Sequence, residues 1–238
     1  MAHRTTNHGQ MRLHGLISLI VVAVATRPLP AQQKFDATPY LISDRSAEVA
    51  LARSAAPPSV SDSAAVLVLT PSGYVEAASG HDGFTCLVIR SFAGALEDPQ
   101  FWNPDVRAPH CFNAPASRTV LQAMLTQSAW ILAGVPKSEI AARAKRAYAS
   151  GALHAPATGA MAYMLSPRQY IVPQNPHWLP HLMLYFDRRS ISASMLGADA
   201  AGKSGIIDES SVNPDDPVLI LMVPVRRWSD GTPAPPAR

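Results

Sequence analysis

Two cysteines constrain the fold of this chain more than any other feature. Cys86 and Cys111 are the only cysteines among its 238 residues. The apolar run 84–90 predicts a strand, and an aromatic, proline-punctuated loop at 98–105 follows it. An even cysteine count in an exported chain predicts a disulfide. The bridge would tie the aromatic loop back to the strand. In the chain-entropy model, a disulfide that closes a loop of this length stabilises the folded protein by about 3.5 kcal/mol.

The first 31 residues have the pattern of an export signal, in which basic residues precede an apolar run that ends at Ala25. Cleavage is expected after Ala31, with Ala25 as the alternative, and Met11 is an alternative start to Met1. An apolar run of about ten residues is too short for a bilayer, which needs roughly 18 to 20. We therefore expect the mature chain, 32–238, to be exported and soluble in the periplasm or outside the cell, without a transmembrane segment.

Net charge gives no reason to expect a nucleic-acid partner. The leader holds three of the 20 Lys and Arg residues and none of the 17 Asp and Glu residues, so the mature chain carries 17 of each sign. The formal charge of +3 therefore belongs to the leader. We expect the partner to be a small molecule or a component of the cell envelope.

The order of predicted elements favours one α+β domain over 32–238. In chain order they are a helix at 43–56, strands at 64–69, 74–78 and 84–90, helices at 117–133 and 137–149, and strands at 160–165, 181–186 and 217–225. Strands grouped before and after helices indicate a mostly antiparallel sheet of about five or six strands with about three helices. The first three strands are expected to form an antiparallel meander, and 190–216 is expected to contain a flexible loop. This order is loosely similar to sensor and profilin-like folds, a resemblance that implies no function.

The densest group of histidines and aromatic residues lies at 176–186. His177 and His181 are four residues apart, a spacing that suits a metal only if one helix face presents both side chains. Pro180 lies between them and a strand follows, so the helical zinc template is broken. A divalent metal on these two histidines remains an alternative, and otherwise no cofactor is expected.

Alternation along the strand predicted from His181 assigns its side chains to two faces. His181, Met183 and Tyr185 share one face, and Leu182, Leu184 and Phe186 share the other. The second set is wholly apolar and is the expected core face. We therefore predict that His181 and Tyr185 line the principal pocket, with His177 at its rim.

Two tryptophans extend the list of pocket candidates. Trp102 lies in the aromatic loop between the cysteines, and Trp178 precedes the strand at 181–186. The segment 197–204 matches the spacing of a phosphate-binding loop, but the polar segment that follows it ends at Pro214 and predicts no helix to hold a phosphate. Nucleotide binding is not expected.

Three function classes are compatible with these observations. The first is an exported ligand-binding or sensory domain, in which the sheet and the loops near Trp102 and Trp178 enclose a mainly apolar pocket. The second is an exported hydrolase that uses His177 and His181 on a metal or an activated water. The third is a structural or interaction module of the envelope.

Overall fold

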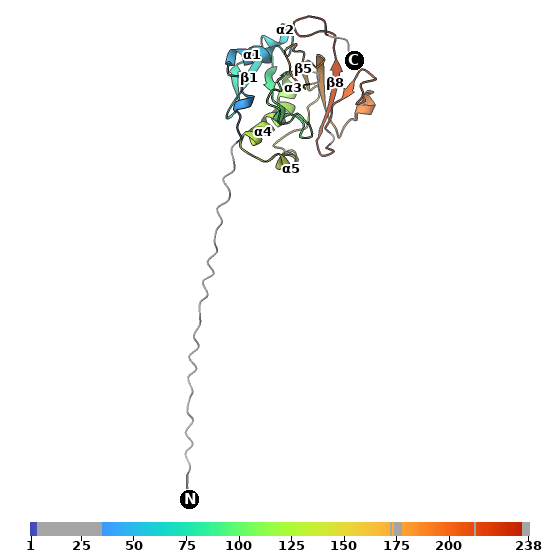
Figure 1. Cartoon of the computed structure of the whole chain (residues 1–238). Helices are drawn as coiled ribbons and strands as arrows, with labels where there is room; N and C mark the ends of the chain where they lie inside the picture. Colours follow the sequence, from blue (N-terminus) through green and yellow to red (C-terminus); the bar gives the residue numbers. More distant parts are fainter. Residues whose placement is uncertain (4–34, 172, 174–177, 212, 235–238) are drawn as a thin grey trace. The chain divides into compact units, whose positions relative to one another are not determined.

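A computed structural model describes most of the chain beyond the expected leader (Figure 1). The described residues are 1–3, 35–171, 173, 178–211 and 213–234. Both expected cleavage points and His177 lie outside them. Residues 33–238 cluster as one compact unit.

One sheet runs through this unit, and its strands have the order β2-β1-β3-β4-β5-β6-β8-β7. The strands are β1 Ala65–Thr70, β2 Gly73–Ala78, β3 Thr85–Ile89, β4 Ala108–Phe112, β5 Met161–Met164, β6 His181–Asp187, β7 Ile207–Asp208 and β8 Val218–Pro224. Neighbours pair antiparallel except for β1 and β3, which are parallel. The α+β class with one mostly antiparallel sheet is confirmed, with eight strands within the described residues instead of five or six.

Helices lie between and around the strands. They are η1 Thr38–Tyr40, α1 Arg45–Arg53, α2 Pro58–Ser61, η2 Ser91–Ala93, α3 Ala114–Ser117, α4 Val120–Leu132, α5 Lys137–Ala149 and η3 Ala193–Leu196. The predicted bounds of α5 are confirmed. Asp44 caps α1, because its carboxylate accepts the N–H groups of Ser46 and Ala47.

The predicted meander of the first three strands is wrong. β2 returns along one side of β1, but β3 pairs with the other side of β1, with Val66 opposite Cys86. The chain must therefore cross the start of β1. Gly80 permits the crossing, since a Cβ atom there would lie 2.0 Å from the Ala65 backbone nitrogen.

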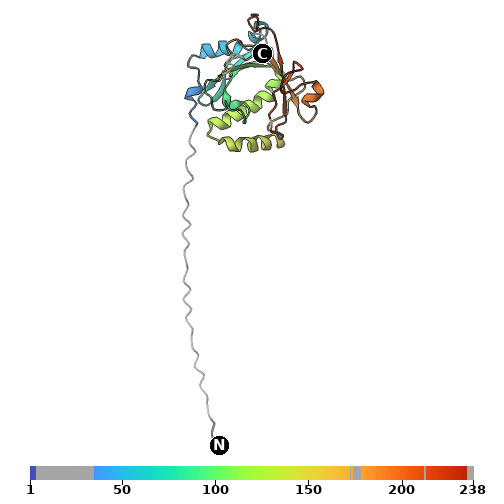
Figure 2. The same ribbon diagram turned by 45° about the vertical axis from the view of Figure 1, so that its right-hand side comes forward.

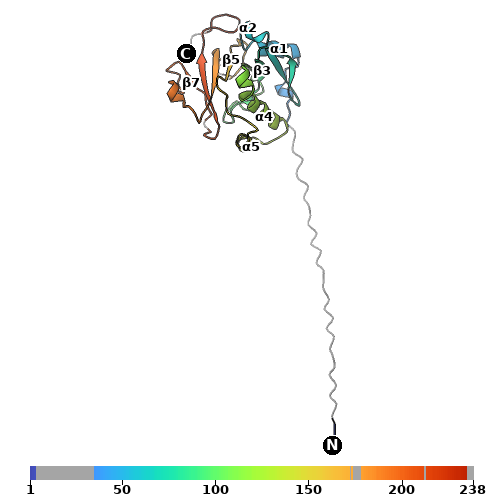
Figure 3. The ribbon, with the colours of Figure 1, turned by 180° about the vertical axis from the view of Figure 1, so that it is seen from behind.

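β4 was not predicted because Pro109 and His110 obscure its strand pattern. β3 pairs with all five of its residues, whereas β5 pairs only with Cys111 and Phe112. Pro109, which has no N–H to donate, thus lies outside the second ladder. β7 has only two residues and lies at the far edge of the sheet, as the view from behind shows (Figure 3).

The helices cover opposite faces of the sheet. Alternate residues of β3 show this, because Leu87 packs in the cluster that contains α4 residues, whereas Val88 packs in the cluster that contains Ala52 of α1. Figure 2 shows α4 and α5 side by side, away from α1. Beyond them, residues 191–206 with η3 pack on Leu184 and Leu219, so part of the expected flexible loop covers the sheet.

The predicted disulfide is confirmed between Cys86 and Cys111. It joins β3 to β4 at directly opposite positions. The bridge therefore links two paired strands, and the aromatic loop is the connection between them. Both cysteines are fully buried beneath α1.

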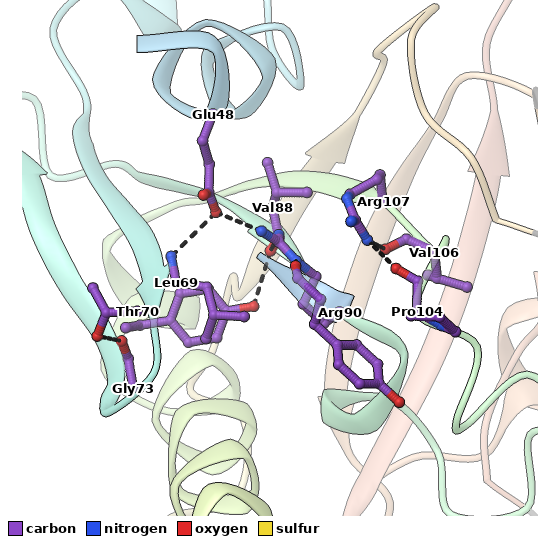
Figure 4. A network of polar contacts seen from close by, with 11 residues as sticks. Glu48, Leu69, Thr70, Gly73, Val88, Arg90, Pro104, Val106 and Arg107 are labelled. Atoms are coloured by element: carbon purple, nitrogen blue, oxygen red, sulfur yellow. Dashed lines mark hydrogen bonds and ion pairs between the residues drawn. The ribbon is translucent and has the colours of Figure 1, made fainter. Parts of the chain in front are cut away.

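A buried polar network fixes α1 on the sheet. Figure 4 shows Glu48 reaching down to Leu69 and Arg90. The Arg90 Nη2 group donates to Glu48 Oε1 at 2.8 Å, and the Leu69 N–H donates to the same oxygen at 3.1 Å. The remaining donors of Arg90 reach the carbonyls of Tyr40 and Val88, at 2.7 and 2.6 Å. The charges are thus paired and hydrogen-bonded, as burial requires.

Candidate functional site

The prediction that Leu182, Leu184 and Phe186 form the core face of β6 is wrong. His181 and Tyr185 are 2% and 1% exposed, and Tyr185 belongs to the main core cluster on the α4 side. Leu184 and Phe186 are only partly buried, under the 191–206 segment. The reason is that both faces of β6 are covered, and the helical layer covers the face that carries the polar side chains.

His181 lies in the core with its ring nitrogens already in contact. Nδ1 is 2.6 Å from the Leu179 carbonyl, and Nε2 is 3.2 Å from the Met164 sulfur. Burial lowers the pKa of His181 to about 4. The pKa of His110 also falls to about 4, chiefly through burial. Both imidazoles are therefore held neutral inside the core.

The two candidate tryptophans pack in different clusters. Trp102 is 46% exposed and contacts Phe101 and Phe35, with ring centroids 4.6 and 5.7 Å away. The Trp178 indole donates to the Met222 sulfur at 3.2 Å. Neither residue lines the cleft beside α4 and α5, and neither do His181 and Tyr185. Their part in binding stays a prediction.

That cleft lies between α4, α5 and two chain segments, 93–97 and the described residues of 209–220, and its volume is about 170 Å³. Its lining is mainly apolar, with Trp130 and Tyr148 among the residues around it. Its apolar side chains include Val120, Met124, Ile140, Ala144, Val218 and Ile220. Alanines on α5 leave space that larger side chains would fill.

The charged side chains around the cleft are mostly acidic. Lys145 is the one cation among the described lining residues, against the carboxylates Glu97, Glu209, Asp215 and Asp216. Lys145 already pairs with Asp215, with 2.9 Å between Nζ and Oδ2. Lys145 neutralises Asp215, so three further carboxylates remain around the apolar cleft.

Burial makes two of these acids harder to ionise. The pKa of Glu209 is raised by burial and then by the charges of Asp208 and Asp98. The pKa of Asp216 is raised by burial and, to a smaller extent, by Glu97, although Arg188 and the Val218 N–H act in the opposite direction. A cation in the cleft would relieve this repulsion.

Polar contacts hold the walls of the cleft in place. Gln127 of α4 donates through Nε2 to the carbonyls of Phe92 and Gly94, at 3.0 and 2.7 Å. The Ser211 hydroxyl donates to Glu97 at 3.0 Å, which joins the two chain segments. Arg188 donates to the Ser211 carbonyl at 2.8 Å. The cleft is therefore largely pre-formed.

Sequence reasoning missed this cleft. One signal was present, since Ile140, Ala144 and Tyr148 form a stripe of helical spacing on α5 and only Ile140 is buried. The acidic wall at 209–216 gave no such signal, because it lies in the segment expected as a flexible loop.

The segment 197–204 does not form a phosphate-binding loop. The Asp199 carboxylate accepts the N–H groups of Ala201, Lys203 and Ser204, which occupies the donors that a phosphate would need. No helix follows in the described residues up to 211.

The described residues contain no group of three or more His, Cys, Asp and Glu side chains that could hold a metal ion. No helix within the described ranges is long and apolar enough to cross a membrane. Comparison of the chain with protein-family models, with curated proteins and with solved structures found no match.

Proposed function

We propose that the mature chain is an exported binding protein whose α4–α5 cleft takes a small molecule with an apolar body and a cationic group. The observation that supports this most is the combination in one cleft of an apolar lining with an excess of carboxylates. A volume of about 170 Å³ suits a six-carbon group, because an apolar cavity of about 150 Å³ admits benzene.

The charge at the rim favours a cation over an anion. Glu209 is repelled by the charge of Asp98, and Asp216 by the charge of Glu97. A ligand ammonium group near these acids would offset the repulsion, whereas a ligand carboxylate would add to it. These groups are partly exposed, so the charge sets selectivity and burial of the apolar body supplies most of the affinity.

Three ligands of equal length and different charge test the proposal. Hexylamine, hexanol and hexanoate would be titrated into the mature protein and followed by calorimetry and by the fluorescence of Trp130, which lines the cleft. The expected order of affinity is hexylamine, then hexanol, then hexanoate. Hexanoate binding as tightly as hexylamine would contradict the proposed class of ligand.

A pair of variants on α5 assigns binding to the cleft. Ala144→Phe fills the cleft and should abolish binding, whereas Ala142→Phe, on the exposed side of the same helix, should leave it unchanged. Glu209→Gln should weaken hexylamine two- to fivefold, which is the scale of a partly exposed ion pair, and leave hexanol unaffected. Equal effects of the two phenylalanine variants would place the ligand elsewhere.

The pH dependence follows from the raised pKa of Glu209. Hexylamine binding should weaken as the pH falls through a range above 4.5, the ordinary value for glutamate, because the carboxylate then takes up a proton. The affinity for hexanol should not follow this change.

A further inference from the structure

Methionines and histidines gather on the α4 side of the sheet, away from the cleft lining. His181 lies opposite Met164 in the pairing of β6 with β5. His110 is paired with Leu87 of β3 and therefore lies on the same face of the sheet. Met183 and Met222 are opposite each other in the next row of the same face. These five residues are called the methionine–histidine cluster below.

Both imidazoles of the cluster are fixed in the same tautomer. The Nδ1 atoms of His110 and His181 lie 2.9 and 2.6 Å from the carbonyls of Ala108 and Leu179. A carbonyl oxygen only accepts, so each Nδ1 carries the proton, and a neutral ring then has a lone pair on Nε2. A backbone carbonyl on one ring nitrogen is also the usual arrangement for a histidine that binds metal through the other.

The contact between His181 Nε2 and the Met164 sulfur has no proton to form a hydrogen bond. The two atoms are 3.2 Å apart, and the His181 side chain is 2% exposed. Protonating Nε2 would place an unpaired cation in the core, which burial opposes. Two electron-pair donors therefore face each other at close range inside the protein.

The geometry points to a Cu(I) site in which His181 Nε2 and Met164 Sδ bind the ion. Thioether sulfur selects soft ions such as Cu(I), and imidazole binds copper well. A monovalent ion suits this buried position because it brings less charge into the core than a divalent one. In zinc sites, bonds of about 2.0 Å to nitrogen and about 2.3 Å to sulfur are usual. With similar bond lengths, an ion bound to both His181 Nε2 and Met164 Sδ, which are 3.2 Å apart, would have an N–metal–S angle of about 95°.

The test uses the mature protein with its disulfide intact, under anaerobic conditions with ascorbate, and the probe is the Cu(I)–bicinchoninate complex. The native protein should withdraw one equivalent of Cu(I). Met164→Leu, which keeps the apolar volume, and His181→Gln should each weaken that affinity at least tenfold. A native protein that withdraws no Cu(I) would overturn the proposal.

A control separates the cluster from surface imidazoles. The double variant His81→Gln/His154→Gln removes two exposed histidines and should bind Cu(I) as the native protein does. Binding that is lost in this variant and retained in Met164→Leu would show surface uptake and overturn the proposal.

Two further measurements keep the test decisive. Near-ultraviolet circular dichroism checks that each variant folds, and if His181→Gln does not fold, Met164→Leu decides alone. X-ray absorption at the copper edge should show both nitrogen and sulfur neighbours in the loaded protein. A spectrum without sulfur would exclude Met164. Either result is independent of ligand binding in the α4–α5 cleft.

Discussion

Glu48 on α1 and Arg90 at the end of β3 form an ion pair in which the side chains are 1% and 0% exposed, with 2.8 Å between Oε1 and Nη2. The same arginine holds η1 through the Tyr40 carbonyl, and the same glutamate holds β1 through the Leu69 N–H. One pair therefore connects four elements: α1, η1, β1 and the end of β3.

Removing one charge of this pair should be costly. Glu48→Gln leaves Arg90 buried without a countercharge, and we expect the free energy of unfolding to fall by about 3 to 5 kcal/mol. Glu139→Gln is the matched control, because it removes the same group from an exposed pair with Arg143 on α5. That change should cost less than about 0.5 kcal/mol. Urea unfolding measures both, and similar costs would contradict the structural role of the pair.

Removing the hydroxyl group of Tyr185 and that of Tyr74 should have different effects on the stability of the protein. In the described part of the chain, the buried Tyr185 hydroxyl has no hydrogen-bond partner, whereas the Tyr74 hydroxyl donates to the Val88 carbonyl at 2.9 Å. Tyr185→Phe should therefore be neutral or stabilise the protein by up to about 1 kcal/mol, and Tyr74→Phe should cost about 0.5 to 1.5 kcal/mol. Thermal unfolding of the two variants checks this. A clear loss in Tyr185→Phe would show that its hydroxyl does have a partner.

Stability should fall in mild acid because of the buried histidines. The folded pKa of His110 and His181 is about 4, against 6.5 for an ordinary histidine, so the unfolded chain binds more protons between these values. Each histidine should remove about 1.4 kcal/mol per pH unit as the pH falls from 6.5 towards 4, and nothing above 6.5.

Urea unfolding from pH 7.5 to 5 measures this slope. In His181→Gln the contribution of one histidine disappears, so the slope should be shallower by that amount. An unchanged slope in this variant would mean that His181 does not titrate as the structure indicates.

Loss of the disulfide should destabilise the protein without changing the sheet. The double variant Cys86→Ala/Cys111→Ala opens a loop whose ends are separated by 25 positions in the sequence, and we expect a cost of about 3.5 kcal/mol in the chain-entropy model. Reductant should lower the stability of the native protein and have no effect on the double variant. Titration of the denatured, unreduced protein should find no free thiol, and finding two would contradict the bridge.

Local sequence signals predicted many of the elements. The bounds of α5 follow from Pro136 and Gly151, and the strand that begins at His181 follows from its apolar run after Pro180. The disulfide follows from the cysteine count. The helix and the strand depend on residues that are close together in the chain. The disulfide depends on the presence of two cysteines, each of which can pair only with the other.

The arrangement of these elements required the tertiary structure. Alternation shows that His181 and Tyr185 share a face, but only the packing of α4 shows that this face is buried. The cleft likewise joins Glu97, α5 and residues 209–216, which are far apart in the sequence. Periodicity relates a residue to its neighbours within one element, so it carries no information about which distant element will cover that residue.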